Sequence, residues 1–494
     1  MIIVAEEPWN LRRVLALFKN DPSNYHETNI EVDPDAELAG AYRYIGTGGT
    51  TARPTGHGPA MMFNKIKGFS NTRVLTGIMG TRQRVAKIFD MDAKRLGQYV
   101  GQAVANPITP VITSNKDVPA HEVVKLATDA DFDLHTLVPA PTNTPEDAGP
   151  YITMGLVLGS SLDGSMSDVT IHRMAIEEKD KLAIYINPGG RHIGDFAKEY
   201  EAQNKPMPIT INIGLDPAIT IGATFAAPTT PIGYDELGVA GAIRNQPVEL
   251  VPAITVEENA IAQSEYTIEG YILPNERMQE DIHTHTGKAM PEFLGYDGVA
   301  NPSLQVIKVT AVTHRSDNPI MQTTLGPSEE LVSMQGITTE ASIWDLTQKA
   351  IPGKVTNVYN PSSGGGKLMT ILQIHKSEAS DEGIQRQAAL LAFSAFKELK
   401  TVWLVDDDVD IFDMDDVMWT MNTRFQGDKD VIVLPESRGH ALDPSQNPKY
   451  DPASIRTIGM TSKTIIDGTV PFDMKEAFKR TQFLAVKDWK KFLK

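Results

Sequence analysis

The chain has 494 residues, 41% hydrophobic and 22% charged, so we expect a folded protein of two or three domains. Its net charge of −17, with basic residues scattered along the chain, argues against nucleic acid and anionic membranes as partners. The lack of cysteine excludes disulfides, thiolate metal sites and cysteine nucleophiles, and no apolar run reaches the roughly 20 residues of a membrane span. The first residues lack a basic region before an apolar core, so we expect no signal peptide and a soluble, cytoplasmic protein.

Residues 1–118 mix helix-forming stretches with turns, and we expect an N-terminal α/β domain there. Helical spacing is clear in TRQRVAKIFD (81–90) and LGQYVGQAVA (96–105). A glycine-rich run follows residue 44, IGTGGTTARPTGHGP. It matches neither the dinucleotide-binding pattern nor the Walker pattern, so a turn is the favoured interpretation.

Residues 119–320 change to short β-prone runs separated by Pro, Gly and Asp, which predicts a β-rich domain with a barrel as one possible form. The expected strands are 151–160, 168–174, 181–188, 207–215 and 304–315. Helical spacing predicts two helices between them, one late in 188–203 and one within 234–246.

Residues 321–494 predict a C-terminal α/β domain. KLMTILQIH (367–375) reads as a strand, IQRQAALLAFSAFKELK (384–400) as a helix and TVWLVDDDVD (401–410) as a buried strand. The tail, KEAFKRTQFLAVKDWKKFLK (475–494), is expected to be helical, with an apolar stripe of Phe478, Phe483 and Trp489 among lysines. Such a tail docks on its own domain or a neighbouring subunit, and a membrane surface is the weaker alternative because the rest of the protein is acidic.

Three separate segments between 168 and 236 carry polar groups with chemical potential. Strand alternation over 168–173 sends Asp168, Thr170 and His172 to one face and Arg173 to the other. Asp168, His192 and Glu236 would form an oxygen and imidazole set suited to Mn²⁺ or Mg²⁺. The alternative is a surface salt-bridge network, which spacing alone does not exclude.

A second group of acids lies in ILPNERMQEDIHTHTGK (272–288). Glu276 and Glu280 are four residues apart and would share a face in a helix, where crowding raises one pKa and makes that carboxyl a usable proton donor. The alternative is a solvated acidic loop, with His283 and His285 an incidental pair.

A third group packs seven aspartates into residues 406–416, followed by Trp419 and Arg424. An EF-hand is excluded because Ile411 and Val417 stand where that loop needs Gly and Glu. The structural interpretation is that these acids cap a strand end and a helix start. ATP chemistry also lacks support, because Leu368 follows Lys367 where a phosphate loop needs Ser or Thr.

Taken in order, these stretches resemble the UbiD family of prenylated-flavin decarboxylases over essentially the whole chain. The resemblance rests on DVTIHR (168–173), GGRHIG (189–194), DPAITIGA (216–223), YDELGVAGAIR (234–244), EGYI (269–272) with the glutamate pair, and VDDDVDIFDMDDVMWTMNTR (405–424). APTNTPEDAGPYIT (140–153), NIGLDPAITIGAT (212–224) and THTGKAMPEF (284–293) are similar to the bacterial gallate and protocatechuate decarboxylase branch. The resemblance implies a mixed α/β protein whose β-rich, split-barrel-like flavin domain is flanked by the two α/β domains.

The family's functional positions fall on these residues by resemblance. Prenylated FMN would contact Asp168, Val169, Thr170, Ile171, His172, Arg173, Arg191, His192, Glu236 and, at its phosphate, Lys400. A divalent ion, Mn²⁺ or Mg²⁺, would bind Asp168, His192 and Glu236, with K⁺ or Na⁺ held by backbone around Ala223 and Thr224. The catalytic group would be Arg173, Glu276 and Glu280.

Glu280 is then the expected proton donor, and Arg173 would orient the substrate carboxylate and keep Glu276 ionised. His314 and His440 are candidates for contacting phenol oxygens, or else hydrogen-bonded core histidines. Two departures stand out: Asp168 replaces an Asn of several relatives, and DIHTHTG follows Glu280 where many relatives have a Gly-Pro-aromatic-Gly turn.

The implied reaction is the reversible, non-oxidative decarboxylation of a phenolic benzoic acid such as gallate or protocatechuate. A flavin prenyltransferase would supply the cofactor, and a homodimer or higher homo-oligomer is expected. Alternatives are the same chemistry on vanillate, 4-hydroxybenzoate or furoate, and a noncatalytic flavin-binding assembly subunit. Intact Arg173, Glu276 and Glu280 argue against the last.

Overall fold

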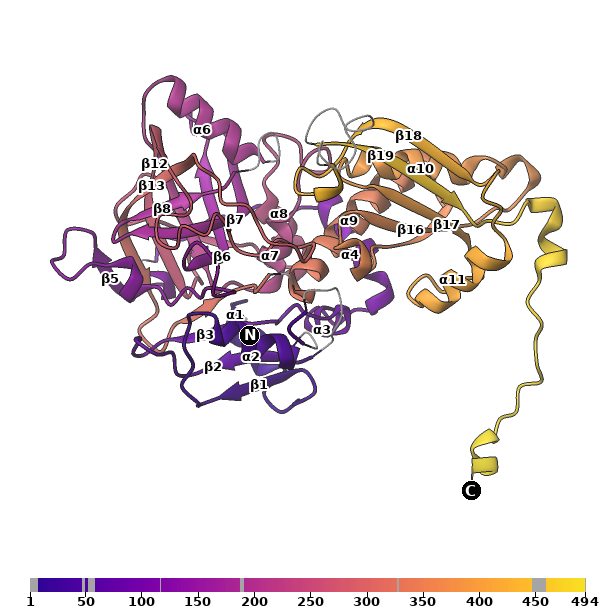
Figure 1. Ribbon diagram of the computed structural model, residues 1–494, viewed down its shortest axis with the longest axis horizontal. Coiled ribbons are helices and arrows are strands. Elements are labelled where there is room, and N and C mark those ends of the chain that lie inside the picture. Colours follow the sequence, from indigo (N-terminus) through magenta and orange to yellow (C-terminus); the bar gives the residue numbers. More distant parts are fainter. Residues whose placement is uncertain are drawn as a thin grey trace, which may run out of the picture.

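The computed structural model describes residues 8–46, 49–51, 58–115, 117–186, 191–326, 328–446 and 459–493. In it, three sheet-based parts follow one another from indigo to orange, and the last segment extends away from them (Figure 1). Most of the glycine-rich run expected to form a turn, and the first two glycines of GGRHIG, lie outside the described residues.

The N-terminal part is a four-stranded sheet, in the order β1-β2-β3-β14, with helices around it. Its strands are β1 (Tyr25–Thr28), β2 (Ala60–Phe63), β3 (Arg73–Thr76) and β14 (Ile320–Gln322), and its helices are α1 (Leu11–Ala16), α2 (Glu37–Gly46), α3 (Arg82–Ile88) and α4 (Leu96–Ala105). Both helices expected from sequence, α3 and α4, are present. The Thr81 side chain caps α3 by accepting from the amide of Arg84.

The central part is a closed six-stranded barrel, because β12 pairs with both β9 and β13 and joins the two ends of the sheet. The barrel strands are β6 (Tyr151–Ser160), β7 (Ser167–Glu178), β8 (Lys181–Ile184), β9 (Met207–Ile213), β12 (Tyr266–Met278) and β13 (Leu304–His314). Aliphatic side chains such as Ile211, Ile268 and Val309 fill it. All five strands expected in this region are present, and a barrel is confirmed.

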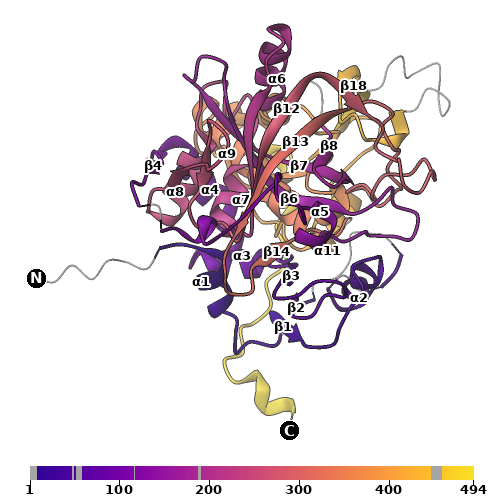
Figure 2. The same ribbon diagram turned by 90° about the vertical axis from the view of Figure 1, so that its left-hand side faces the viewer.

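Further elements surround the barrel. The short strands are β4 (Val111–Ile112), β5 (Val123–Leu126), β10 (Glu249–Pro252) and β11 (Asn259–Ile261), and the helices are α5 (Leu134–Leu137), α6 (His192–Ala202), α7 (Pro217–Gly222) and α8 (Glu236–Arg244). Helices α6 and α8 are the two expected from sequence. Figure 2 shows α7, α8 and α4 gathered on one side of the barrel.

The C-terminal part is a five-stranded sheet in the order β15-β16-β17-β19-β18. Its strands are β15 (Val355–Tyr359), β16 (Met369–Ile374), β17 (Thr401–Asp406), β18 (Val431–Arg438) and β19 (Met460–Asp467), and its helices are α10 (Ile384–Ala395) and α11 (Met414–Thr423). The parallel pair β16–β17 joined through α10 is the α/β unit expected there.

A 22-residue helix, α9 (Glu329–Ala350), connects the barrel to the C-terminal sheet and packs against α4. No helix was expected at this place. The reason is physical: α9 is buried on most sides, so its sequence lacks the single apolar face on which helix prediction depends.

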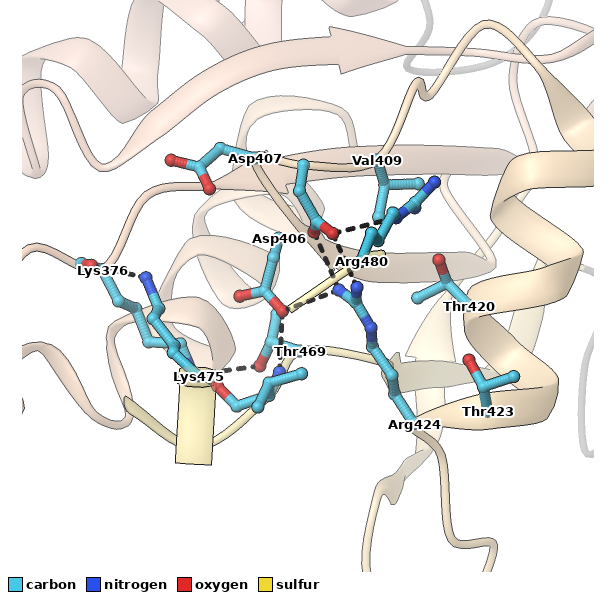
Figure 3. Close-up of polar contacts among 12 residues, drawn as sticks. Lys376, Asp406, Asp407, Val409, Thr420, Thr423, Arg424, Thr469, Lys475 and Arg480 are labelled. Carbon is cyan, nitrogen blue, oxygen red and sulfur yellow. Dashed lines mark hydrogen bonds and ion pairs between the residues drawn. The ribbon is translucent and has the colours of Figure 1, made fainter. Parts of the chain in front are cut away.

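The aspartate-rich segment holds loop ends together. Asp406 Oδ2 accepts from the amide of Val470 at 2.8 Å, and Asp413 caps α11 by accepting from the amide of Asp415. Arg424 spans Asp406 and Asp408, and Arg480 also reaches Asp408, so two guanidinium groups converge on the loop after β17 (Figure 3). The strand-end and helix-cap roles expected for these acids are confirmed.

Residues 481–493, here called the C-terminal arm, lead away from the rest of the chain in both views (Figures 1 and 2). The helix expected over 475–494 does not form in the described part of that range, which has only short 3₁₀ turns, Phe472–Phe478 and Trp489–Leu493. Among the described helices, none combines the length and apolar character that crossing a membrane requires.

Candidate active site

A cavity of about 250 Å³ lies where the barrel meets the C-terminal part. Barrel strands form one wall, the loop after β12 contributes residues 290–293, and the loops around β16, β17 and residue 440 form the opposite wall. The polar and charged side chains that line it are Thr153, His172, Arg173, Tyr185, Arg191, Thr224, Glu292, Thr324, Gln335, Lys367, Lys397, Glu398 and His440.

Arg173 of β7 is the charged centre of the barrel wall. Its Nε lies 3.0 Å from Oε1 of Glu280, its Nη1 contacts Oε1 of Glu292, and its guanidinium carbon lies 4.6 Å from the ring centre of Tyr185. Burial alone would lower the pKa of Arg173, but Glu292 and Glu280 raise it overall. The guanidinium therefore stays charged and can bind a carboxylate at the cavity wall.

Lys367, Glu398 and His440 form a second polar group on the opposite wall. Nζ of Lys367 lies 3.2 Å from Nε2 of His440 and 3.6 Å from Oε2 of Glu398, and the Phe293 ring lies 4.9 Å from the His440 ring. Burial, reinforced by the Lys367 charge, lowers the pKa of His440 to about 4. Burial would raise the pKa of Glu398, but Lys367 and His440 lower it to about 2. This wall offers a neutral imidazole and a paired ammonium.

His172 and Arg191 extend the barrel wall. His172 Nδ1 lies 3.0 Å from the carbonyl of Tyr185, while Nε2 is buried without a hydrogen-bond partner within the described ranges. Burial and the Arg191 charge lower the pKa of His172 to about 3, so the ring is neutral with its proton on Nδ1. Arg191 donates to the carbonyls of Thr224 and Phe225.

Asp168 and Glu236 lie close enough for their charges to interact. Burial raises the pKa of both carboxyls, and the Asp168 charge raises that of Glu236 further. Oε2 of Glu236 is buried without a hydrogen-bond partner among described atoms. His192 Nε2 instead lies 3.1 Å from the carbonyl of Thr230. In the part of the chain that the structure describes, no three His, Asp or Glu side chains are arranged to hold a metal ion.

Glu276 does not lie beside Arg173, contrary to the sequence-based expectation. It remains on β12 and pairs with Lys181 at 3.2 Å. Strand β12 ends at Met278, and the chain then turns so that Glu280 alone enters the interior. The helical spacing on which the expected Glu276–Glu280 pair depended is therefore absent.

Several other expected site residues lie away from the cavity. Lys400 binds Asp443 and Ser445 at 2.8 and 2.6 Å, and His314 Nδ1 lies 2.6 Å from the carbonyl of Arg315 with its ring against Tyr266. Val169, Thr170 and Glu280 are buried but are not among the cavity-lining residues. The expected face alternation is also modified, since Ile171, His172 and Arg173 all line the cavity.

Glu292, Lys367 and Glu398 are candidate site residues that sequence reasoning missed. Glu292 lies in THTGKAMPEF, a stretch that resembles the gallate and protocatechuate branch, and Lys367 was considered only as a phosphate-loop lysine. Glu398 falls near the end of a predicted helix, where a single acid looks like an ordinary surface residue. Only the fold brings these three positions to the same cavity.

Family models match three successive segments of the chain. They are described as the N-terminal, Rift-related and C-terminal domains of 3-octaprenyl-4-hydroxybenzoate carboxy-lyase, and they cover residues 20–104, 111–329 and 332–468.

Known proteins resemble the chain over nearly its full length. A gallate decarboxylase of Lactiplantibacillus plantarum is 71% identical over 99% of this chain and all of its own. The apo structure of a 3,4-dihydroxybenzoic acid decarboxylase from Enterobacter cloacae has a TM-score of 0.92 and 53% identity, covering 98% and 99% of the two chains. A structure of an evolved dimeric form of the UbiD-class enzyme HmfF from Pelotomaculum thermopropionicum, in complex with prFMN, has a TM-score of 0.81 and 28% identity over 98% of each chain. The chain belongs to the UbiD family of carboxy-lyases.

Proposed function

We propose that this carboxy-lyase catalyses the reversible, non-oxidative decarboxylation of a phenolic benzoic acid, either gallate or protocatechuate. The observation that carries the proposal is the two-ended cavity, with Arg173 and Glu292 on one wall and Lys367, Glu398 and His440 on the other. Such a cavity suits a flat ring with a carboxylate at one end and hydroxyl groups at the other. The names of the gallate and 3,4-dihydroxybenzoate relatives agree with that substrate class.

We propose prenylated FMN as the cofactor, as in the HmfF complex. The neutral His172, with its unpartnered Nε2, and the cation Arg191 fit a flavin with its phosphate. When bound, the modified flavin supplies an electron sink for the bonding electrons that departing CO₂ leaves on the ring. A flavin prenyltransferase would provide the cofactor.

A divalent ion, Mn²⁺ or Mg²⁺, would be held by Asp168 and Glu236, with His192 as the third side chain. The two buried carboxyls repel each other and Oε2 of Glu236 has no hydrogen-bond partner in the described structure, a combination that a cation relieves. K⁺ or Na⁺ would be held by backbone oxygens around Ala223 and Thr224.

The chain's own groups divide the work of the reaction. Arg173 binds the substrate carboxylate and holds it toward the barrel wall. Lys367 and His440 bind the phenolic hydroxyls, which fixes the ring between the two walls. With the substrate carboxylate on Arg173, Glu292 carries a proton, gives it to the ring carbon that has lost CO₂, and returns to the carboxylate that pairs with Arg173. We assign this step to Glu292 in place of Glu280, because Glu292 lines the cavity while Glu280 is buried behind Arg173.

Panel assays with the holoenzyme test the proposal. The chain is co-expressed with a flavin prenyltransferase, the cofactor is identified by mass and absorbance, and CO₂ release is measured for gallate, protocatechuate, vanillate, 4-hydroxybenzoate and furoate. Faster turnover of gallate or protocatechuate supports the assignment. Faster turnover of vanillate, 4-hydroxybenzoate or furoate would assign the chain a different substrate within the UbiD family. Flavin binding without turnover of any acid would support the noncatalytic assembly subunit.

We also propose a homodimer or higher homo-oligomer. The HmfF relative is described as an evolved dimeric form, which shows that a related chain assembles with itself.

A further inference from the structure

Glu398 is a charged carboxylate of the cavity wall that accepts no hydrogen bond from the described residues. Its Oε2 lies 3.6 Å from Nζ of Lys367 and 3.5 Å from Nε2 of His440, and both distances are long for a hydrogen bond. Burial would raise the pKa of Glu398, but Lys367 and His440 lower it to about 2, so the group keeps its charge. A hydrogen-bond donor from a ligand in the cavity would therefore stabilise this carboxylate.

The neutral ring of His440 carries its proton on Nε2. The amide of Leu442 donates to Nδ1 of His440 at 3.1 Å, so Nδ1 has a lone pair. Burial, reinforced by the Lys367 charge, lowers the pKa of His440 to about 4, which leaves one ring proton, and that proton must be on Nε2. Nε2 lies 3.2 Å from Nζ of Lys367, and two N–H groups do not satisfy each other. Both groups can therefore donate to a ligand oxygen.

The resulting pattern of two donors beside one acceptor matches a pair of neighbouring hydroxyl groups on a ring. The oxygen of one hydroxyl accepts from Lys367 and His440, and the O–H of the next donates to Glu398. Phe293 borders this part of the cavity, with its ring centre 4.9 Å from that of His440 and 5.2 Å from Nζ of Lys367. A substrate whose carboxylate is on Arg173, at the barrel wall, would present the far edge of its ring to these groups.

We propose that Glu398 determines specificity by selecting rings that carry a free hydroxyl next to the para hydroxyl. That hydroxyl supplies the donor that the carboxylate lacks. A methoxy group at the same position has no proton to donate, and its methyl group excludes water, so Glu398 would stay charged and unpaired. The inference rests on the proposed function, because it takes the ring to be a phenolic benzoic acid.

The expected order of substrates follows from this contact. Protocatechuate and gallate both have the free hydroxyl and should be accepted best. 4-Hydroxybenzoate leaves room for a water molecule that can donate to Glu398, so it should come next. Vanillate, with its methoxy group, should come last.

Two ring compounds of similar size test the role of the donated proton. 3-Amino-4-hydroxybenzoate keeps a donor at the position that faces Glu398, and 3-methyl-4-hydroxybenzoate lacks it. The holoenzyme, co-expressed with a flavin prenyltransferase, should decarboxylate the amino compound with a kcat/KM at least about tenfold higher, the usual effect of one hydrogen bond to a charged group. Calorimetric binding of 2-aminophenol and 2-methylphenol, which lack the carboxylate, should show the same order.

Glu398→Gln tests the inference on the protein. It removes the charge and keeps the shape of the side chain, so the ratio of kcat/KM for protocatechuate to that for vanillate should fall by about tenfold or more. Glu292→Gln is the matched control, because it should slow both acids by the same factor and leave the ratio unchanged. A Glu398→Gln enzyme that loses activity toward both acids equally would make Glu398 only a structural partner of Lys367 and would overturn the inference.

Failure of the inference and failure of the proposed function give different results. If an active decarboxylase handles the amino and methyl compounds equally, the role of Glu398 is wrong and the proposed function stands. If 2-aminophenol binds more tightly than 2-methylphenol but no acid releases CO₂, Glu398 still selects the ligand and the proposed function is wrong.

Discussion

Arg173 acts on two carboxylates that differ in their access to the cavity. Glu280 is fully buried, accepts from the amide of Asn301 at 2.8 Å and lies within hydrogen-bonding distance of the Tyr151 hydroxyl at 3.3 Å. Glu292 reaches Arg173 from the loop after β12 and lines the cavity. One carboxylate therefore positions the guanidinium from behind, and the other can meet a substrate.

Replacing Glu292 by Gln should remove the proton donor and keep the shape of the side chain. We expect Glu292→Gln to lower kcat by about 10²–10⁴, the usual range for loss of a general acid. Glu276→Gln is the matched control, because the Glu276 side chain pairs with Lys181 on the barrel and lies away from the cavity. Its kcat should stay close to that of wild type. CO₂ release by both holoenzymes measures the difference. A Glu292→Gln enzyme with the kcat of wild type would exclude Glu292 as the proton donor and leave Glu280, the donor expected from sequence.

Glu177, a buried residue of β7, should make stability depend on pH. Burial, with the charges of Glu280 and Asp281, raises its pKa from 4.5 to about 8. Between about pH 5 and pH 8 the folded chain keeps a proton that the unfolded chain has lost, so stability falls as the pH rises through this window. Glu177→Gln should match wild type near pH 5 and exceed its Tm by a few degrees near pH 8.

Thermal unfolding across that pH range checks this expectation. Glu199→Gln, which removes an exposed carboxylate of α6 that does not act on Glu177, should keep the wild-type pH dependence. A Glu177→Gln protein whose Tm follows the wild-type curve at every pH would show that Glu177 is ionised in the folded state.

At the residue scale, the sequence predicted the centre of the candidate site better than its edges. His172, Arg173, Arg191 and His440 were expected from motifs and line the cavity. Glu292 was missed because the stretch that contains it was read only as a resemblance, and Glu398 because its neighbours in sequence give no signal. The environment of both is created by segments distant in the chain. Glu276 was wrongly placed because its position depends on where β12 ends.

Helix packing at the scale of elements depends on two glycines of α4. A Cβ at Gly97 would lie 2.7 Å from Cβ of Glu340 on α9, and one at Gly101 would lie 3.1 Å from Cδ1 of Trp344. These glycines let α4 and α9 approach closely, and α9 in turn carries the link to the C-terminal part. The distance between α4 and α9 therefore affects the position of the C-terminal cavity wall relative to the barrel wall.

Gly97→Ala should destabilise the protein although alanine is the better helix former. We expect a loss of about 1–3 kcal/mol from the steric conflict, which outweighs the gain in propensity of roughly 1 kcal/mol. Gly40→Ala is the control, since a Cβ there meets nothing within 4 Å and α2 should gain slightly. The free energy of unfolding, measured by denaturant titration, should fall for Gly97→Ala and rise slightly for Gly40→Ala. A stabilised Gly97→Ala would mean that α4 and α9 adjust freely.

Elements whose sequence is β-prone or has helical spacing were predicted well, even where nearly every residue is buried, as in β6, β9 and α8. The strands β6 and β9 and the helices α8 and α10 follow strand-like or helical patterns in the sequence. Helix α9 has no such pattern because its neighbours cover several of its faces. A barrel could be expected from the run of strands, but which strands close it could not be predicted, since strand patterns do not specify the β12–β13 pairing.

At the scale of the whole molecule, the cavity lies between parts that are far apart in the chain. Strand β14 returns to the N-terminal sheet and β4 pairs with β10, so the N-terminal and central parts share strands as well as faces. The domain boundaries near residues 118 and 320 stay a prediction. A ligand bound in this cavity contacts the barrel and the C-terminal part together.

Cofactor loading should therefore stabilise the molecule as a whole. At a ligand concentration one hundred times Kd we expect about 2.7 kcal/mol of stabilisation, seen as a higher Tm of chains co-expressed with a flavin prenyltransferase. Arg191→Ala should lose most of this shift. Lys400→Met should keep the shift in Tm, because Lys400 binds Asp443 and Ser445 away from the cavity. Loss of the shift in Lys400→Met would instead support the phosphate-binding role expected from sequence.

The two walls of the cavity belong to a closed barrel and to a separate sheet, and they should differ in how well they tolerate substitutions. Every barrel strand is paired on both sides, so mutations near His172 or Arg173 disturb a ring in which each strand constrains the next. Lys367 and His440 instead sit on loops, which tolerate substitution more readily. Directed evolution toward substrates with other ring substituents should therefore select substitutions on those loops. The residues of the barrel wall should stay unchanged.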